Sequence, residues 1–170
     1  MYFSDYSIYL AEVILTNDEA LEERQMATVL LKNFISTHWN SDSQGSKEPT
    51  VKSVVKTKLK SVLPLGLSDT VRKIQIGIAS TLATIAKFDY PHNWPEMIPL
   101  ITSKINSSNE NDVYGILIFL NECSRILQES YLTILSPVLH DSLYQICQNE
   151  EVRLKKFQLL SMLCKNEGQN

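Results

Sequence analysis

Residues 89–97 read DYPHNWPEM and form a corner between two helical patterns. Neither Pro91 nor Pro95 can donate a backbone N–H, and each disfavours the α conformation in the residue before it. A continuous helix is therefore excluded here, although Pro95 suits the first turn of a following helix. Trp94 is expected to pack as an anchor at the bend. The segment predicts a stiff connection between two helices.

Apolar residues recur at helical spacing on both sides of this corner. The core stripe expected in residues 20–37 is Leu21, Met26, Ala27, Val29, Leu30, Phe34 and Ile35. In residues 50–63 it is Val51, Val54, Val55, Leu59, Val62 and Leu63. No segment of the sequence keeps the alternation of a strand, which predicts an all-α fold. About eight helices are expected, over 3–15, 20–37, 50–63, 69–88, 95–106, 111–129, 136–148 and 150–164.

The start of every second helix repeats a pattern of acidic residues followed by an apolar run. Subtracting the numbers of aligned residues gives spacings of 48, 42 and 39 between Arg24, Arg72, Tyr114 and Arg153. The hairpins of HEAT and armadillo repeats recur about every 40–47 residues and bury their apolar faces by stacking. We therefore predict one domain, 1–170, made of a half repeat (3–15), hairpins 20–63, 69–106 and 111–148, and a lone helix 150–164.

Residues 64–69 carry the signals that separate the first hairpin from the second. Pro64 and Gly66 are expected to end the helix of 50–63. Ser68 or Asp69 is expected to cap the helix that follows.

Composition excludes several classes of protein. Apolar residues make up 44 % of the 170 residues and charged ones 21 %, as in ordinary folded proteins, and the net charge is −3. This balance gives no general attraction to nucleic acid or to anionic membranes. No apolar run approaches the roughly 20 residues of a membrane-spanning helix. The three cysteines lie in apolar helical patterns and are expected to be buried, reduced thiols: Cys123, Cys147 and Cys164.

The titratable residues form no catalytic or metal-binding pattern. His140 and Cys147 are spaced to share one helix face, but structural zinc needs four ligands at tight spacing. His38 and His92 have no such neighbours, and Cys123 lies within an apolar stripe rather than beside a base. The sequence therefore predicts no enzyme, no metal and no cofactor.

The helix at 50–63 is the best candidate for a binding surface. Lys52, Lys56 and Lys60 recur four residues apart and form one basic stripe, which we expect opposite the apolar face. A solvated lysine face without a partner is the alternative interpretation.

Two segments resemble the importin-β (karyopherin-β) family of nuclear transport receptors. Residues 24–39, RQMATVLLKNFISTHW, are similar to its R-Q-x-A-x-x-x-L-K-N…W signature, and residues 89–97 to its D-W/Y-P-x-x-W-P corner. The matching residues are Arg24, Gln25, Ala27, Leu31, Lys32, Asn33, Trp39, Asp89, Pro91, Trp94 and Pro95. The sequence between the two motifs is similar to the importin-9 branch, and the resemblance covers roughly residues 7–150.

The resemblance implies an α-solenoid of HEAT-type hairpins whose second helices line a concave surface. In the family the first repeats receive the GTPase Ran in its GTP form. Positions that this implies as contacts with Ran or cargo are Lys52, Lys56, Lys60, Glu96, Ser103, Asn106, Asp141 and Gln145. Most signature residues are expected to be architectural, with Arg24 bridging to an acidic group of the adjacent repeat and Trp39 closing a turn.

The resemblance also implies partners and location. Basic cargo such as core histones and ribosomal proteins, together with nucleoporins, is expected, without direct binding of nucleic acid or insertion into membranes. The location would be the cytoplasm and the nucleus, with passage through the nuclear pore. Because the family has a helix before residue 3 and many repeats after residue 164, we expect a chain truncated at both ends. The alternative is a helical-repeat interaction scaffold without Ran recognition.

Overall fold

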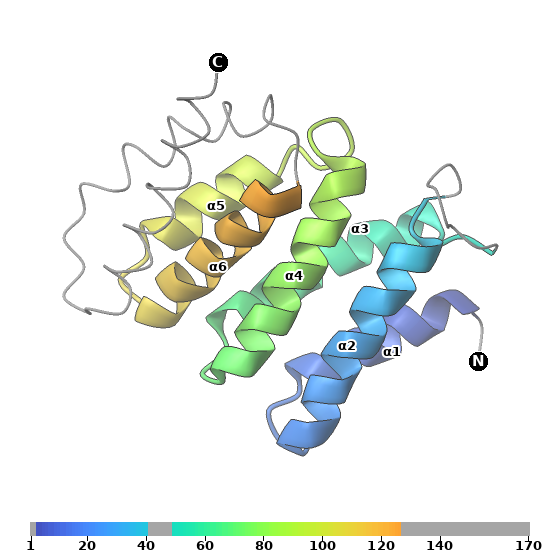
Figure 1. Cartoon of the computed structure of the whole chain (residues 1–170), viewed down its shortest axis with the longest axis horizontal. Helices are drawn as coiled ribbons and strands as arrows, with labels where there is room; N and C mark the ends of the chain where they lie inside the picture. The colour runs from blue at the N-terminus through green and yellow to red at the C-terminus, as the bar shows by residue number, and fades with distance from the viewer. Residues whose placement is uncertain (1–2, 41–48, 127–170) are drawn as a thin grey trace.

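The computed structural model describes residues 3–40 and 49–126 (Figure 1). Within these residues the backbone forms six α-helices and one 3₁₀ helix, and no strand, which confirms the all-α prediction. In chain order they are α1 (Phe3–Leu15), α2 (Leu21–His38), α3 (Ser53–Val62), η1 (Leu63–Ser68), α4 (Arg72–Asp89), α5 (Met97–Ile105) and α6 (Glu110–Ile126). The helices predicted over 136–148 and 150–164 lie outside the described residues.

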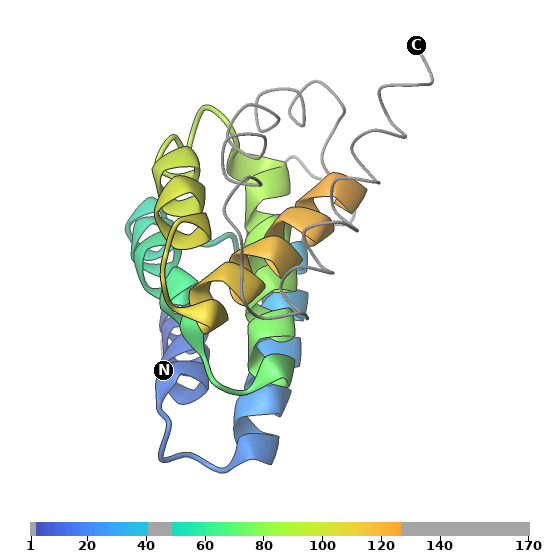
Figure 2. The same cartoon turned by 90° about the vertical axis from the view of Figure 1, so that its left-hand side faces the viewer.

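The helices form two layers, which Figure 2 shows side by side. In the first layer α4 packs between α2 and α6, and the second layer holds α1, α3 and α5. Across the layers α1 packs on α2 and α5 packs on α6. Successive helix pairs are therefore stacked, which is the arrangement of a helical-repeat solenoid.

The buried face of α2 differs from the predicted stripe. The side chains that α2 buries are Arg24, Ala27, Thr28, Leu31, Phe34 and Ile35. The members of the predicted stripe that are exposed are Leu21, Met26, Val29 and Leu30. Because this helix carries apolar residues on more than one side, periodicity alone does not identify the side that faces the core. In α3 the same error places Val54 in the core, whereas its side chain is 81 % exposed.

The two prolines expected at helix boundaries do not lie where they were predicted to lie. Helix α3 does end at Val62, but η1 follows directly, with Pro64 in its first turn. A proline is tolerated there because the first N–H groups of a helix need no intrahelical partner. Pro95 lies two residues before Met97, the first residue of α5, rather than inside its first turn.

Asp69 does not cap α4 as predicted, because the N-cap residue is Val71 and no described side chain makes a capping bond there; Asp69 instead holds the turn before the helix. Its Oδ1 accepts a hydrogen bond from the backbone N–H of Val71 at 2.8 Å. Ser68, the other candidate, donates instead to the carboxylate of Asp112 in α6. The short connection therefore forms a turn before α4 and contacts the next repeat.

Glycines allow two close approaches between helices. A Cβ added at Gly77 of α4 would lie 2.6 Å from Oγ1 of Thr28 in α2. A Cβ added at Gly115 of α6 would overlap the backbone carbonyl of Leu67 in η1. Only a residue without a Cβ fits Gly115, because the backbone of η1 cannot turn aside as a side chain can.

Candidate protein-recognition surface

One buried carboxylate joins the two sequence motifs. Asp89, the last residue of α4, accepts a hydrogen bond from the indole Nε1 of Trp39 at 3.0 Å and one from Nζ of Lys60 at 2.8 Å. Lys60 also donates to the backbone carbonyl of Asn93 in the proline corner. The three side chains therefore bind the end of α2, the helix α3 and the corner after α4 into one unit.

Arg24 makes the bridge between repeats that the sequence suggests. Its Nε donates to the carbonyl of Ile14 in α1 at 2.9 Å, and its Nη2 pairs with Asp69, just before α4. Both side chains of this ion pair are almost fully buried. Arg24 therefore connects the half repeat, the first hairpin and the second hairpin.

A second polar cluster joins η1 and α5 to α6. Nζ of Lys104 lies 2.7 Å from Oδ1 of Asp112 and 2.6 Å from Oγ of Ser68, and Ser107 donates to Oδ2 of Asp112 at 2.8 Å. Burial raises the pKa of the Asp112 carboxyl, but hydrogen bonds from Lys104, Ser68 and Ser107 outweigh burial and lower the pKa below its ordinary value. No spacing rule in the sequence pointed to this cluster, because its members come from η1, α5, α6 and the connection between α5 and α6.

The remaining motif residues divide into buried and exposed groups. Ala27 and Leu31 are buried, and Trp94 is buried with its ring centroid 6.4 Å from that of Phe119. Gln25 and Pro91 are half-buried. The exposed motif residues are Lys32, Asn33 and Pro95. The side chains of Lys32 and Asn33 therefore lie at the surface rather than in the buried links made by Arg24 and Trp39.

The lysines of α3 do not form a free stripe opposite the core. Lys60 is bound by Asp89 and only 14 % exposed, and Nζ of Lys56 lies 5.3 Å from the centroid of the Trp39 ring. Lys52 is exposed. Lys56 and Lys60 therefore face Trp39 and Asp89, because both positions lie beside the buried Leu59 on the helix and not across from it.

The exposed surface of the α1–α3–α5 layer has a different composition from the one predicted. On α3 it carries Val54, Thr57, Lys58 and Ser61, and on α1 it carries Tyr9 and Glu12. Lys58 lies 3.8 Å from Glu12, both at the surface. The spacing of apolar residues would have predicted an exposed Val54 if the core face of α3 had been centred on Leu59.

The polar positions predicted on α5 are exposed as a contact surface requires. Glu96, Ser103 and Asn106 lie at the surface, whereas Asp141 and Gln145 lie outside the described residues. Beside Glu96 the surface has a hollow of about 360 Å³ between α3 and the proline corner. Its lining residues are Thr57, Lys60, Ser61, His92, Asn93, Trp94, Pro95 and Glu96. The candidate surface therefore combines exposed polar side chains with one shallow hollow.

The described residues hold no group of three or more His, Cys, Asp and Glu side chains that would suit a metal ion. Cys123 is a buried free thiol, and burial, with a smaller effect of Glu122, raises its pKa. Cys147, Cys164 and His140 lie outside the described part of the chain. No helix between residues 3 and 40 or between 49 and 126 has both the length and the apolarity to cross a membrane.

Comparison with known proteins places this stack of helix pairs in one protein family. The family model of the importin-beta N-terminal domain matches residues 2–67, and that of the exportin 1-like protein matches residues 72–169. The chain therefore belongs to the importin-β family, and its sequence is similar to importin-9 within that family.

Similar proteins support the same assignment. Importin-9 of Drosophila melanogaster is 31 % identical over 153 residues, which cover 88 % of this chain and 15 % of that protein. Importin subunit beta-5 of Schizosaccharomyces pombe is 27 % identical, covering 84 % of this chain and 15 % of that protein. Yeast importin-β (Kap95p) superimposes with a TM-score of 0.80 at 20 % identity, covering 99 % of this chain and 21 % of that chain. The predicted solenoid fold is confirmed, and the chain spans about a seventh of the curated relatives.

Proposed function

We propose that this chain forms the N-terminal repeats of an importin-9-like nuclear import receptor. In this proposal the α1–α3–α5 layer receives Ran in its GTP form. The receptor contributes to the carriage of basic cargo, such as core histones and ribosomal proteins, through nuclear pores. Shuttling between cytoplasm and nucleus follows from that role.

The observation that carries the proposal is the match of residues 2–67 to the importin-beta N-terminal domain. The exposed residues of the α1–α3–α5 layer support it, since they are available for contact while the Lys60–Asp89 ion pair holds α3 against the end of α4. A rigid surface gains affinity because binding does not have to order it. Nucleoporin binding is proposed by analogy with a fold neighbour, the Kap95:Nup1 complex, which has a TM-score of 0.76.

Release of cargo would follow from differential affinity. The switch loops of a GTPase have different conformations with GTP and with GDP. If this surface fits only the GTP form, Ran–GTP binds the receptor in the nucleus. Binding then shifts the receptor from its cargo-bound state towards its cargo-free state. The net charge of −3 is compatible with basic cargo, although the chain spans only 15 % of the length of importin-9 of Drosophila melanogaster.

The test is a pull-down of purified Ran, loaded with GTP or with GDP, on the immobilised chain. Retention of the GTP form alone is expected. Val54→Glu on α3 and Asn106→Arg after α5 should each weaken binding about tenfold, since charge and bulk oppose close contact at an interface. Asn33→Arg, on the opposite layer, is the matched control and should bind as the wild type does. Equal retention of both forms, or of neither, would favour a scaffold without Ran recognition.

A further inference from the structure

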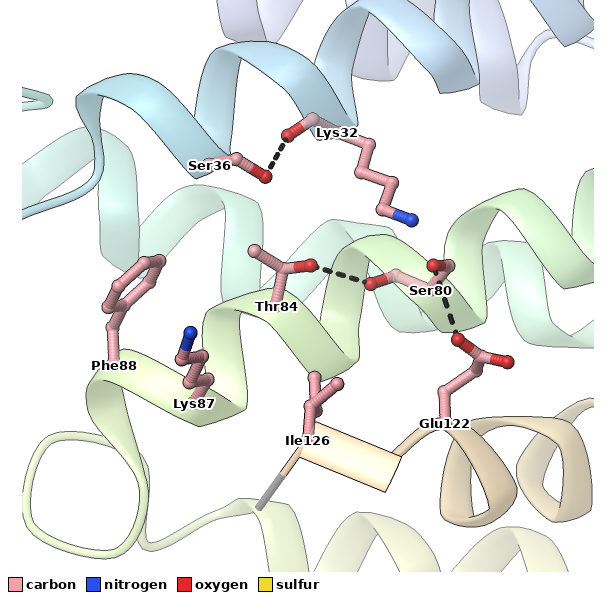
Figure 3. Close-up of a pocket in the computed structure, with 8 residues that line it drawn as sticks. All are labelled: Lys32, Ser36, Ser80, Thr84, Lys87, Phe88, Glu122 and Ile126. Carbon is pink, nitrogen blue, oxygen red and sulfur yellow. Dashed lines mark hydrogen bonds between the residues drawn. The ribbon is translucent and has the colours of Figure 1, made fainter. Parts of the chain in front are cut away.

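The α2–α4–α6 layer carries a groove that the proposed function does not use. The groove has a volume of about 630 Å³, within the range of ligand-binding pockets, and Figure 3 shows its lining side chains. Those residues are Lys32, Ser36, Ser80, Thr84, Lys87, Phe88, Glu122 and Ile126. They come from three helices that are adjacent in space, so the groove exists only in the stacked fold.

Two ammonium groups in this groove lack a counter-charge. Lys32 on α2 and Lys87 on α4 take part in no ion pair within the described residues, and both side chains are exposed. The groove has one carboxylate, Glu122, which accepts a hydrogen bond from Ser80 at 3.4 Å and pairs with Arg125 at 3.4 Å. The groove is therefore locally positive on a chain whose net charge is −3.

The other polar groups of the groove leave the lysines as its main free donors. Ser36 donates to the carbonyl of Lys32 and Thr84 to that of Ser80, each at 2.9 Å. Their hydroxyl protons are thus bound within their own helices. A ligand recognised here must accept hydrogen bonds from Lys32 and Lys87 and must carry negative charge.

Apolar surface completes the groove. Phe88 is half-buried near one end, and Ile126 on α6 is 37 % exposed (Figure 3). An inorganic anion would leave this apolar surface in water, whereas a peptide with an apolar side chain between acidic ones would cover it.

We propose that this groove binds an acidic segment of a partner protein. Carboxylates of the segment pair with Lys32 and Lys87, and an apolar side chain packs on Phe88. Nucleic acid fits less well, because its affinity comes from neutralising many phosphates and only two lysines of the described residues line the groove. The site is separate from the proposed Ran surface, so either proposal can fail without the other.

The test measures fluorescence anisotropy of a short labelled peptide of alternating glutamate and leucine with the 170-residue chain. Binding is expected at about 50 mM salt and should weaken severalfold at about 300 mM, as screening of exposed charges requires. Lys32→Glu and Lys87→Glu should each weaken binding about tenfold, because each replaces an attraction by a repulsion.

Lys73→Glu is the matched control, since Lys73 is an exposed lysine of α4 that does not line the groove. This variant should bind the peptide within about twofold of the wild type. Far-UV circular dichroism should show all three variants folded, and Lys32→Gln and Lys87→Gln provide milder substitutions. Equal peptide binding by wild type and the Lys32 and Lys87 variants would overturn the proposal. Tighter Lys32-dependent binding of a single-stranded oligonucleotide, or of the corresponding lysine–leucine peptide, would overturn it too.

Discussion

Replacing Asp89 by alanine tests how strongly one carboxylate holds the first two hairpins together. In the native protein Asp89 accepts from Trp39 Nε1 at 3.0 Å and from Lys60 Nζ at 2.8 Å, and its side chain is 7 % exposed. The variant leaves a buried indole N–H without an acceptor and an ammonium group without its counter-charge.

The magnitude follows from these two losses. Removing one partner of a buried ion pair costs about 3–5 kcal/mol, and an unsatisfied buried donor costs about 1–3 kcal/mol. The two costs do not add, because the flexible side chain of Lys60 can turn towards water once it is released. We expect Asp89→Ala to lower the free energy of unfolding by about 3 kcal/mol. For a chain of this size that corresponds to a fall in Tm of roughly 6–12 °C.

The assay is urea unfolding followed by far-UV circular dichroism. Asp89→Asn should cost less than Asp89→Ala, since its amide oxygen still accepts from Trp39. Lys60→Met should destabilise the native protein more than it destabilises Asp89→Ala, because its partner is already absent in the variant. Asp5→Ala, at an exposed position of α1, is the control and should change stability by less than about 0.5 kcal/mol. A loss below about 1 kcal/mol for Asp89→Ala would refute the central role of this carboxylate.

Three further predictions test packing and electrostatics. Gly115→Ala should lower the free energy of unfolding by about 3 kcal/mol or more, since the new methyl group meets the carbonyl of Leu67. Urea unfolding measures this change, and an unchanged free energy of unfolding would contradict the close approach of α6 and η1. Because the pKa of Asp112 is lowered on folding, its charge stabilises the protein at neutral pH and this contribution is lost as pH falls through the folded pKa, below the unfolded value near 3.9. The stability difference between wild type and Asp112→Asn should therefore stay constant near neutral pH and shrink as pH falls below about 4. A difference independent of pH would count against the Lys104–Asp112 pair. Cys123 should resist alkylation by iodoacetamide until the chain unfolds, since its thiol is buried and its pKa is raised. Peptide mass spectrometry measures the labelling, and alkylation of Cys123 in the native protein would contradict this prediction.

Sequence reasoning predicted the helices well because their signals are local. The proline corner and the repeat spacing can be recognised without knowing which parts of the chain are in contact. The sequence indicated that Arg24 would bridge to an acidic group of the adjacent repeat. Its partner, Asp69, is 45 residues away, so only the folded structure identifies it.

The candidate surface was predicted less well because it depends on the rotation of each helix about its axis. The spacing of Lys52, Lys56 and Lys60 showed that they share a side of α3, but not which side. The structure turns Lys60 towards Asp89 and turns Val54 outwards. The groove beside Lys32 likewise needs three helices in place before it exists.

Hydrogen–deuterium exchange of the chain with Ran–GTP and with Ran–GDP tests the proposed recognition surface most directly. Slower exchange is expected in α1, α3 and α5 with Ran–GTP alone, while α2, α4 and α6 exchange as in the free protein. Protection confined to α2, α4 and α6, or the same protection with both nucleotides, would contradict recognition of Ran–GTP by the α1–α3–α5 layer.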